Sequence, residues 1–388
     1  MTNANNLTGS AGFSDSKKHY PVLDGLRGVA AVLVVMFHVM ETFTGGDNQK
    51  QIINHGYLAV DFFFVLSGFV IGYAYDDRWG KMTLGGFFKR RLIRLHPMII
   101  AGMIVGAILF YFQESPWMPA IAQTSVARML LVMLIGFTLI PVPLSMDIRG
   151  WTEMHPLDGP AWSLFFEYIG NILYAFIFRF VPNWILGIFV ALCGAALVHF
   201  AVFGPQGDVI GGWSLDPVQL KLGFIRLLYP FFAGLLLSRV VKPGRLSNAF
   251  LWCSLLLVII FSVPRIGGVD HKWMNGLYVA FSIIVLFPLI VYMGASADEK
   301  EGQPSRIIKF LGDLSYPLYI THYPIIYFFT AWVSHHQELV TSGSSADLLK
   351  LVAAGIGVLV SSITLAWLCF RFYDVPVRKW LTKKWMGK

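Results

Sequence analysis

Charged residues are scarce in this sequence. They make up 13 % of its 388 positions, whereas ordinary soluble domains contain about 25 %. Hydrophobic residues make up 56 %, above the roughly 45–50 % of soluble domains. Apolar runs near the length that crosses a hydrocarbon core, about 20 residues, recur from Leu26 almost to the C-terminus. The composition therefore excludes a water-soluble protein and predicts an all-α polytopic membrane protein.

Cysteine is scarce as well. Cys193, Cys253 and Cys369 lie in apolar runs without the spacing of metal ligands, so we expect packing or lipid-facing roles and no metal. A cleavable signal peptide is also missing, because the first apolar run follows more than twenty polar residues, contains Arg27 and lacks a small-residue cleavage site. We expect this run to remain as the first transmembrane helix.

The apolar runs give eleven candidate spans. We expect a flexible tail over residues 1–20, one membrane domain over 21–375 and a basic tail over 376–388. The candidate spans are 24–43, 57–75, 97–113, 124–143, 161–181, 183–203, 222–240, 247–264, 276–294, 310–333 and 348–372.

The net charge of +8 comes from basic stretches in short segments beside apolar spans. This is the cytoplasmic bias of membrane loops, which we prefer to nucleic-acid binding. The dense stretches are 78–94, 239–245, 300–309 and 371–388. If all four face the cytoplasm, about ten spans cross with both termini inside, and either 97–113 or 124–143 is re-entrant or bent.

One face of the first span carries four ionisable groups. Arg27 and His38 are eleven positions apart, which at about 100° per residue returns to one face about 16 Å further along the axis. Asp24 and Glu41 lie within about 60° of that stripe. Asp24, Arg27 and Glu41 could each snorkel to an interface, but His38 is too deep, so we expect it to be functional.

Two more segments carry polar groups beside apolar spans. The second span, GYLAVDFFFVLSGFVIGYAY, contains Asp61 and Ser67. A local capping or pairing role for Asp61, and close helix packing at Ser67, are at least as good interpretations as a functional role. The following FFKRRLIRLHP contains Arg90, Arg91 and Arg94. These arginines either set topology or bind phosphates, for which the guanidinium fork is well suited.

Further polar groups lie in the fifth span and near the C-terminus. Glu167 follows Ser163 by four residues in an apolar helix and needs a partner or a water-lined pocket. The segment LGDLSYPLYITHYP places Asp313, Ser315, Tyr316, Tyr319 and His322 around two prolines. A broken polar segment in a membrane borders a cavity, and a kinked core helix is the alternative.

These motifs together describe a membrane site with deep histidines, a carboxylate and a basic cluster. Histidine is the natural general base near neutral pH. Group transfer is the simplest chemistry that joins a phosphate-rich donor at the basic cluster to a base inside the bilayer. Two other interpretations stay open. A transporter or flippase would use the buried charges as a path, although no inverted repeat is found. A sensor would use the scaffold without catalysis.

Five motifs in order resemble the membrane acyltransferase-3 family over residues 20 to 380. They are LDGLRGVAAVLVVMFH, VDFFFVLSGFVIGY, FFKRRLIRLHP, GPAWSLFFEY and LGDLSYPLYITHYP. The resemblance implies a ten-helix fold that moves an acyl group, most often acetyl, from cytoplasmic acyl-coenzyme A to a carbohydrate hydroxyl. Relatives also acylate macrolides or succinylate glucans.

The resemblance also implies roles for particular residues. It places the family histidine on His38, its partner arginine on Arg27, its loop arginines on Arg91 and Arg94, and its Trp-Ser-Leu motif on residues 162–164. We therefore expect catalysis by His38, Glu167 and His322; coenzyme binding by Arg27, Arg90, Arg91 and Arg94; and substrate binding by Asp24, Asp61, Ser67, Trp162, Ser163, Ser315, Tyr316 and Tyr319.

We expect acetyl-coenzyme A as co-substrate, a carbohydrate acceptor, the lipid bilayer of the inner membrane and other polysaccharide-modification proteins as partners. His38 acts as the base or carries the acyl group covalently. Arg27 binds the coenzyme or orients the helix through Asp24. The sequence ends about 15 residues after its last span, without the esterase-like domain fused to some relatives. If transfer to a polymer outside needs a second catalyst, we therefore expect a separate protein to supply it.

Overall fold

The computed structural model describes Lys17, residues 19–298 and residues 305–387. Most of the predicted flexible tail, residues 1–20, lies outside the described residues. The helices are α1 (Pro21–Phe43), α2 (Ala59–Tyr75), α3 (Leu84–Leu109), α4 (Ala120–Gln123), α5 (Val126–Phe137), α6 (Ala161–Phe176), α7 (Asn183–Phe203), α8 (Pro217–Val240), α9 (Ala249–Ser262), α10 (Lys272–Phe281), α11 (Phe287–Ala295), α12 (Arg306–Thr321), α13 (Tyr323–His335), α14 (Gln337–Thr341), α15 (Ser345–Cys369) and α16 (Val375–Met386). In the described ranges, β pairing is limited to an isolated bridge between Leu246 and Ala297, which confirms the all-α class.

Seven apolar helical segments of the described chain are long enough to cross a membrane. Shorter apolar helices, α5 and α9, accompany them. The protein is therefore a multi-pass membrane protein, as predicted. The seven segments are Pro21–Phe43, Gly56–Arg78, Leu84–Gln113, Asn183–Phe203, Pro217–Val240, Lys272–Ala295 and Ser345–Met386. In the last of them a π-helical turn, Phe370–Asp374, joins α15 to α16, so most of the predicted basic tail is helical.

The basic motif FFKRRLIRLHP lies in a long helix and not in a loop. Helix α3 begins after Thr83, whose side chain accepts a hydrogen bond from the Gly86 amide at 3.0 Å. It continues through Pro97 to Leu109, so the predicted span 97–113 is the second part of a longer helix. The description of Arg91 and Arg94 as loop arginines, implied by the resemblance, is therefore wrong for this chain. A capped start and mostly good helix formers explain the extension.

The predicted span 124–143 is re-entrant. Helix α5 ends at Phe137, and Leu139 adopts a positive φ of 61°, where the chain turns back. The Arg128 side chain, near the start of α5, donates hydrogen bonds to the carbonyls of Ser145 at 2.7 Å and Asp147 at 3.3 Å. The segment therefore returns to the end of the bundle at which it began, which favours 124–143 over 97–113 as the re-entrant segment.

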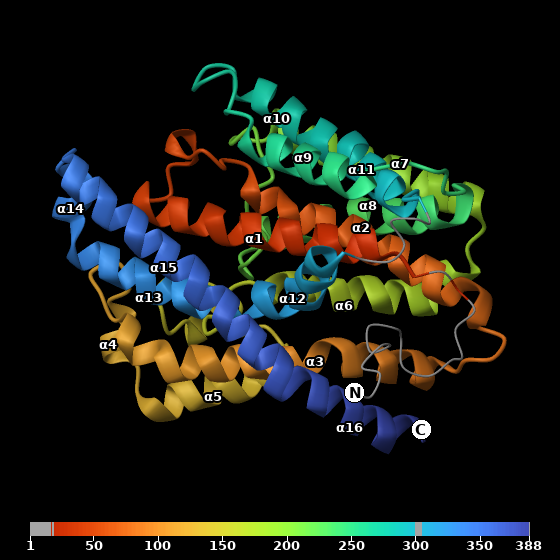
Figure 1. Cartoon of the computed structure of the whole chain (residues 1–388), viewed down its shortest axis with the longest axis horizontal. Coiled ribbons are helices and arrows are strands. Elements are labelled where there is room, and N and C mark those ends of the chain that lie inside the picture. The colour runs from red at the N-terminus through yellow and green to blue at the C-terminus, as the bar shows by residue number, and fades with distance from the viewer. Residues whose placement is uncertain (1–16, 18, 299–304, 388) are drawn as a thin grey trace.

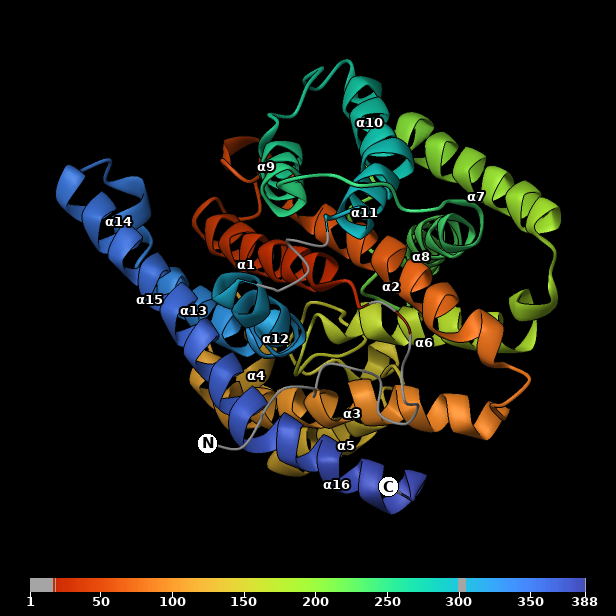
Figure 2. The same ribbon diagram turned by 45° about the vertical axis from the view of Figure 1, so that its right-hand side comes forward.

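The helices run roughly along one axis (Figure 1). We call the end with the N-termini of α1 and α3 and the C-termini of α8 and α16 the basic end, because Arg27, Arg90, Arg94, Arg239 and Arg378 lie there. The opposite end contains the C-terminus of α1, the N-terminus of α8 and the short α14. Figure 2 shows α12 and α6 between the pair α1 and α2 above and the pair α3 and α5 below.

Glycines allow two helix pairs to approach closely. A Cβ on Gly28 of α1 would lie 2.3 Å from the Leu311 carbonyl oxygen of α12, and one on Gly68 of α2 would lie 1.8 Å from the Phe231 carbonyl oxygen of α8. Side chains larger than hydrogen would therefore separate the backbones, as is common where membrane helices pack on small residues. The contact with α12 brings the C-terminal polar motif against α1.

The predicted single span 310–333 is two helices, α12 and α13, joined at His322. Pro324 stands in the first turn of α13 and has no N–H to donate to the Ile320 carbonyl, which loses its helical donor. Interrupted backbone inside a membrane protein is tolerated where it is buried in protein or borders a cavity. The junction therefore leaves a backbone carbonyl without its helical donor beside His322. The break itself was predicted from the two prolines.

Candidate active site

The structure brings His38 of α1 beside His322 at the α12–α13 junction. The two imidazole rings stack with centroids 5.6 Å apart and planes inclined by 29°. The Tyr323 ring lies edge-on to His38 at 4.8 Å. The Nδ1 atom of His38 lies 2.7 Å from the Glu41 carboxylate, which leaves Nε2 as the nitrogen available to a substrate.

His322 is fully buried and is held by the backbone. Its Nδ1 lies 2.8 Å from the Tyr319 carbonyl and 3.1 Å from the Leu318 carbonyl. Because a carbonyl only accepts hydrogen bonds, Nδ1 carries the proton and Nε2 has a free lone pair. Among the described residues, that Nε2 atom has no hydrogen-bond partner. An unpaired, buried acceptor of this kind is unusual and is available to a bound group.

The Ser163 hydroxyl connects α6 to α12. It donates to the Pro160 carbonyl at 3.0 Å and lies 2.8 Å from the Tyr319 hydroxyl, so the tyrosine donates to the serine. Trp162 faces away from this bond and lies against the guanidinium of Arg226, 5.2 Å from the ring centroid. Ser163 and Tyr319 thus lie beside the histidines, whereas Trp162 packs against Arg226.

Ser315 and Tyr316 hold the start of the broken segment. The Ser315 hydroxyl donates to the Gly312 carbonyl within its own helix at 2.8 Å, and the Tyr316 hydroxyl donates to the Leu95 carbonyl of α3 at 2.5 Å. Both hydroxyls therefore have protein partners in this structure. Their contacts join α12 to α3 between the basic end and the histidines.

Glu167 joins three helices. Its Oε1 accepts a hydrogen bond from Ser67 of α2 at 2.7 Å and one from Arg91 of α3 at 2.6 Å. The Arg91 side chain is 6 % exposed, and the Glu167 side chain is 17 % exposed. A charge-assisted pair with so little exposure to solvent is strong. Arg91 is therefore paired with a carboxylate inside the bundle, one helical turn nearer the α3 N-terminus than Arg94.

The arginines at the basic end differ in their partners. Arg27 pairs with Asp24 at 3.0 Å, and Arg378 of α16 pairs with Asp374 at 3.2 Å. Arg94 lies within electrostatic reach of Arg27, Arg378 and Asp24 but has no carboxylate partner in the part of the chain that the structure describes. Arg90 donates to the Gly86 carbonyl at 2.9 Å. Positive charge is therefore concentrated around Arg94 at this end of the bundle.

Asp61 lies in a separate, closed ion pair. Its carboxylate accepts hydrogen bonds from Nε and Nη2 of Arg226 at 3.2 and 2.7 Å, and both side chains are almost fully buried. Arg226 also donates to the carbonyls of Gly211 and Tyr57, both at 2.8 Å. The arginine was missed from the sequence. The signal for it was Asp61 itself, because a carboxylate in an apolar helix requires a cation.

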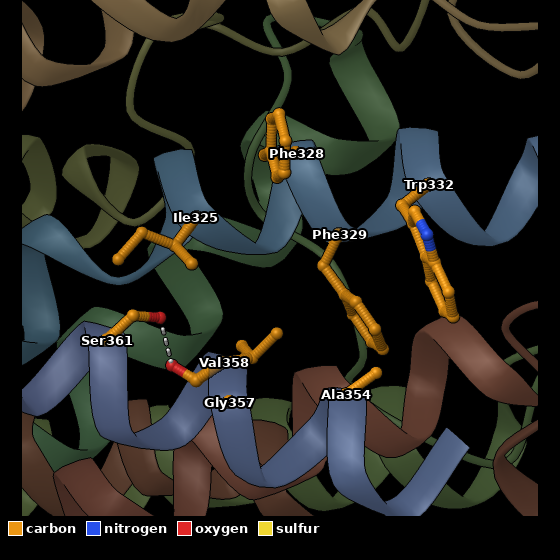
Figure 3. Close-up of a pocket in the computed structure, with 8 residues that line it drawn as sticks. All are labelled: Ile325, Phe328, Phe329, Trp332, Ala354, Gly357, Val358 and Ser361. Carbon is orange, nitrogen blue, oxygen red and sulfur yellow. Dashed lines mark hydrogen bonds between the residues drawn. The ribbon is translucent and has the colours of Figure 1, made fainter. Parts of the chain in front are cut away.

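A groove of about 250 Å³ between α13 and α15 is lined by mostly apolar side chains (Figure 3). The Ser361 hydroxyl on this groove donates to its own helix at the Val358 carbonyl, 3.0 Å away. The groove carries no ionisable side chain. Its lining residues are Ile325, Phe328, Phe329, Trp332, Ala354, Gly357, Val358 and Ser361.

No group of three or more metal-ligating side chains comes together in the described ranges. The site instead consists of a polar series that runs from the basic end to the histidines. Its members are Arg94 and its neighbours, the Arg91–Glu167 pair, Tyr316, the Ser163–Tyr319 pair, and His322 with His38 and Glu41.

Comparisons with known proteins show the family of the chain. The model of a family described as an acyltransferase domain matches residues 20–371. Protein 2 in the picA locus of Rhizobium radiobacter is 33 % identical over 165 residues, which are 41 % of this chain and 82 % of that protein.

Two further relatives match along most of the chain. The O-acetyltransferase OatA of Staphylococcus aureus is 25 % identical over 94 % of this chain, and the peptidoglycan O-acetyltransferase OatA of Listeria monocytogenes is also 25 % identical over 94 %. The match spans only 58 % and 56 % of the lengths of these relatives. No solved structure matches. Because the family model covers almost the whole chain, the protein belongs to the acyltransferase-3 family of membrane acyltransferases.

Proposed function

We propose that the protein moves an acetyl group from cytoplasmic acetyl-coenzyme A to a hydroxyl of a carbohydrate. The observation that carries the proposal is the pairing of His38 with Glu41 at 2.7 Å, beside a second histidine whose Nε2 is unpartnered. A base oriented by a carboxylate is the arrangement that activates a hydroxyl nucleophile. Glu167, paired with Arg91, positions α3 against α6 in this proposal and does not act on the substrate.

The reaction begins when Nε2 of His38 takes the proton of the acceptor hydroxyl. The hydroxyl oxygen attacks the thioester carbonyl carbon, and the carbonyl electron pair moves to its oxygen. The tetrahedral intermediate then expels the coenzyme A thiolate, which receives the proton from the imidazolium. Glu41 holds the Nδ1 proton throughout and stabilises the imidazolium that forms. His322 provides a second acceptor beside His38.

The basic end is the entry for the donor in this proposal. Positive residues favour the cytoplasmic side of a membrane protein, and acetyl-coenzyme A carries several phosphate charges. Arg94 lies near Arg27 and Arg378 without a carboxylate of its own. Guanidiniums bind phosphates bidentately, so we assign the donor phosphates to this group, with Arg90 at its edge.

The acceptor reaches the histidines from the opposite end. A relative named as a peptidoglycan O-acetyltransferase supports a cell-envelope carbohydrate, and the bacterial plasma membrane is the corresponding location. Other polysaccharide-modification proteins would carry the acetyl group further where the acceptor is a polymer. A macrolide acceptor or succinyl transfer to a glucan would use the same donor site with a different acceptor.

Release of free coenzyme A tests the proposal. The purified full chain is mixed with acetyl-coenzyme A and candidate acceptors, and thiol release is followed with a chromogenic reagent while the product is identified by mass spectrometry. We expect acceptor-dependent release that falls by about 10²–10⁴-fold in His38→Ala. Undiminished transfer by a folded His38→Ala variant would refute the role of His38. Movement of a substrate without thioester cleavage would instead support a transporter.

A further inference from the structure

The last helix, α16, carries unpaired positive charge. After Asp374 the sequence VPVRKWLTKKWMGK contains five basic residues and no acidic one. Arg378 pairs with Asp374 at 3.2 Å. In the part of the chain that the structure describes, Lys379, Lys383 and Lys384 have no carboxylate partner. These three charges take no part in the mechanism above.

Helix α16 lies beyond the hydrocarbon core of the membrane. The segment Ser345–Met386 is helical over 42 residues, which is a length of about 63 Å. Its first part, α15, has 25 residues and at about 38 Å already exceeds the roughly 30 Å of hydrocarbon. The two helices form one rod that crosses the bundle obliquely and ends at the basic end (Figures 1 and 2). We therefore place α16 at the depth of the lipid headgroups.

The two sides of α16 have different surroundings. On one side, four exposed residues fall within an arc of about 140° around the helix axis. They are Lys379, Trp380, Lys383 and Lys384. The opposite side is half-buried, and from it Arg378 lies within electrostatic reach of Arg94. The outward arc, defined by these four residues, therefore faces away from the polar series inside the bundle.

The outward arc combines ammonium groups with an exposed aromatic ring. The Trp380 side chain is 57 % exposed, and Nζ of Lys384 lies 4.9 Å from the centroid of its ring. Trp385 and Phe372 expose 39 % and 69 % on either side along the helix. Such rings are unfavourable in water, but at a membrane surface tryptophan lies among the headgroups and lysine extends to the phosphates. A helix dissolved in water would explain the lysines and not the rings.

We propose that the outward arc of α16 binds the headgroups of anionic phospholipids. Its three ammonium groups complement the phosphodiester of a lipid with net negative charge, whereas a zwitterionic headgroup adds a positive charge that opposes them. The aromatic rings hold the helix at that depth. The inference does not depend on the proposed function, because it concerns the side of α16 that faces away from Arg94.

Selective retention of lipid by the full chain tests the inference. The purified chain is equilibrated at low ionic strength in micelles with equal amounts of phosphatidylglycerol and phosphatidylcholine of the same acyl chains, and retained lipids are counted by native mass spectrometry. We expect the native chain to retain phosphatidylglycerol preferentially. In the triple variant Lys379→Gln, Lys383→Gln and Lys384→Gln, the ratio of the two lipids falls about tenfold or more, since each lysine near an anionic surface contributes about fivefold.

A second triple variant, Lys50→Gln, Lys272→Gln and Lys350→Gln, is the matched control. These lysines are exposed at the opposite end of the bundle, and two of them pair with Asp47 and Asp347 at 3.2 and 2.9 Å. We expect the lipid ratio of this variant to stay within about twofold of native. For the native chain, salt at about 1 M shortens the screening length to about 3 Å and lowers the ratio. Both variants keep their helices, because glutamine is a good helix former.

Three results would overturn the inference. The first is a lipid ratio within about twofold of native in the α16 variant, and the second is an equal loss in the control variant. The third is displacement of phosphatidylglycerol by an equal concentration of glycerol 3-phosphate, which would assign the outward arc to free phosphates. None of these bears on the proposed function, which the release of coenzyme A tests separately.

Discussion

Replacing Glu41 by glutamine tests the central pairing of the site. The Glu41 carboxylate lies 2.7 Å from Nδ1 of His38, three residues earlier in α1. Glutamine keeps the size of the side chain and a carbonyl that accepts the Nδ1 proton, but it removes the negative charge. The substitution therefore isolates the stabilisation of the imidazolium that forms when His38 takes the acceptor proton.

The size of the effect follows from the exposure of the pair. Hydrogen bonds to charged groups contribute about 1.5–3 kcal/mol. The Glu41 side chain is 30 % exposed and the His38 side chain 18 %, so solvent screening favours the lower value. A loss of about 1.5 kcal/mol in the transition state lowers kcat about tenfold. The KM for acetyl-coenzyme A should not change, because Glu41 lies far from the phosphate site.

Steady-state release of coenzyme A from the purified chain measures both constants. Glu338→Gln is the matched control, because Glu338 is exposed on α14 at the same end of the bundle and its replacement should leave kcat unchanged. A folded Glu41→Gln variant with a kcat within about twofold of native would show that the carboxylate does not support the base. A lower kcat in the control would point to a general effect of charge at that end.

Three further predictions concern the packing and the buried charges. Gly28→Ala should lower the stability by about 1–3 kcal/mol because its Cβ has no room, whereas Gly187→Ala, with open space around its Cα, should not; thermal unfolding in detergent compares them. Asp61→Leu should cost about 3–5 kcal/mol by leaving Arg226 buried and unpaired, and the double variant with Arg226→Leu should recover much of the folded yield. Burial raises the pKa of Glu153 to about 7 against a usual 4.5. The free energy of unfolding should therefore fall by on the order of 3 kcal/mol between about pH 4.5 and pH 7, as this acid ionises. In Glu153→Gln the melting temperature should depend less on pH, and an unchanged dependence would contradict the burial argument.

Much of the site could be predicted from residues close in sequence. Helical periodicity placed Arg27 and His38 on one face of α1, and the structure puts Glu41 against His38 one turn later. The cluster of polar residues around two prolines predicted a broken segment, which is the junction at His322. These features depend on contacts within one helix or on proline, and both can be recognised in a single sequence.

Other assignments required the packing of distant segments. The sequence could not show that Glu167 would pair with Arg91, that Asp61 would be closed off by Arg226, or that the re-entrant segment was 124–143 and not 97–113. Each depends on which face of one helix meets which face of another. Periodicity gives the face that is polar but not its partner.

By itself, the sequence determined that the chain crosses the membrane several times, that it is helical, and that its motifs follow the order of the acyltransferase-3 family. Apolar length, residue period and motif spacing are properties of the chain alone. Only the tertiary structure decided that His38 meets His322 and that Glu167 pairs with Arg91. The reason is physical: these contacts depend on glycines that let helices approach and on the burial of unpaired polar atoms, which exist only once the helices are packed.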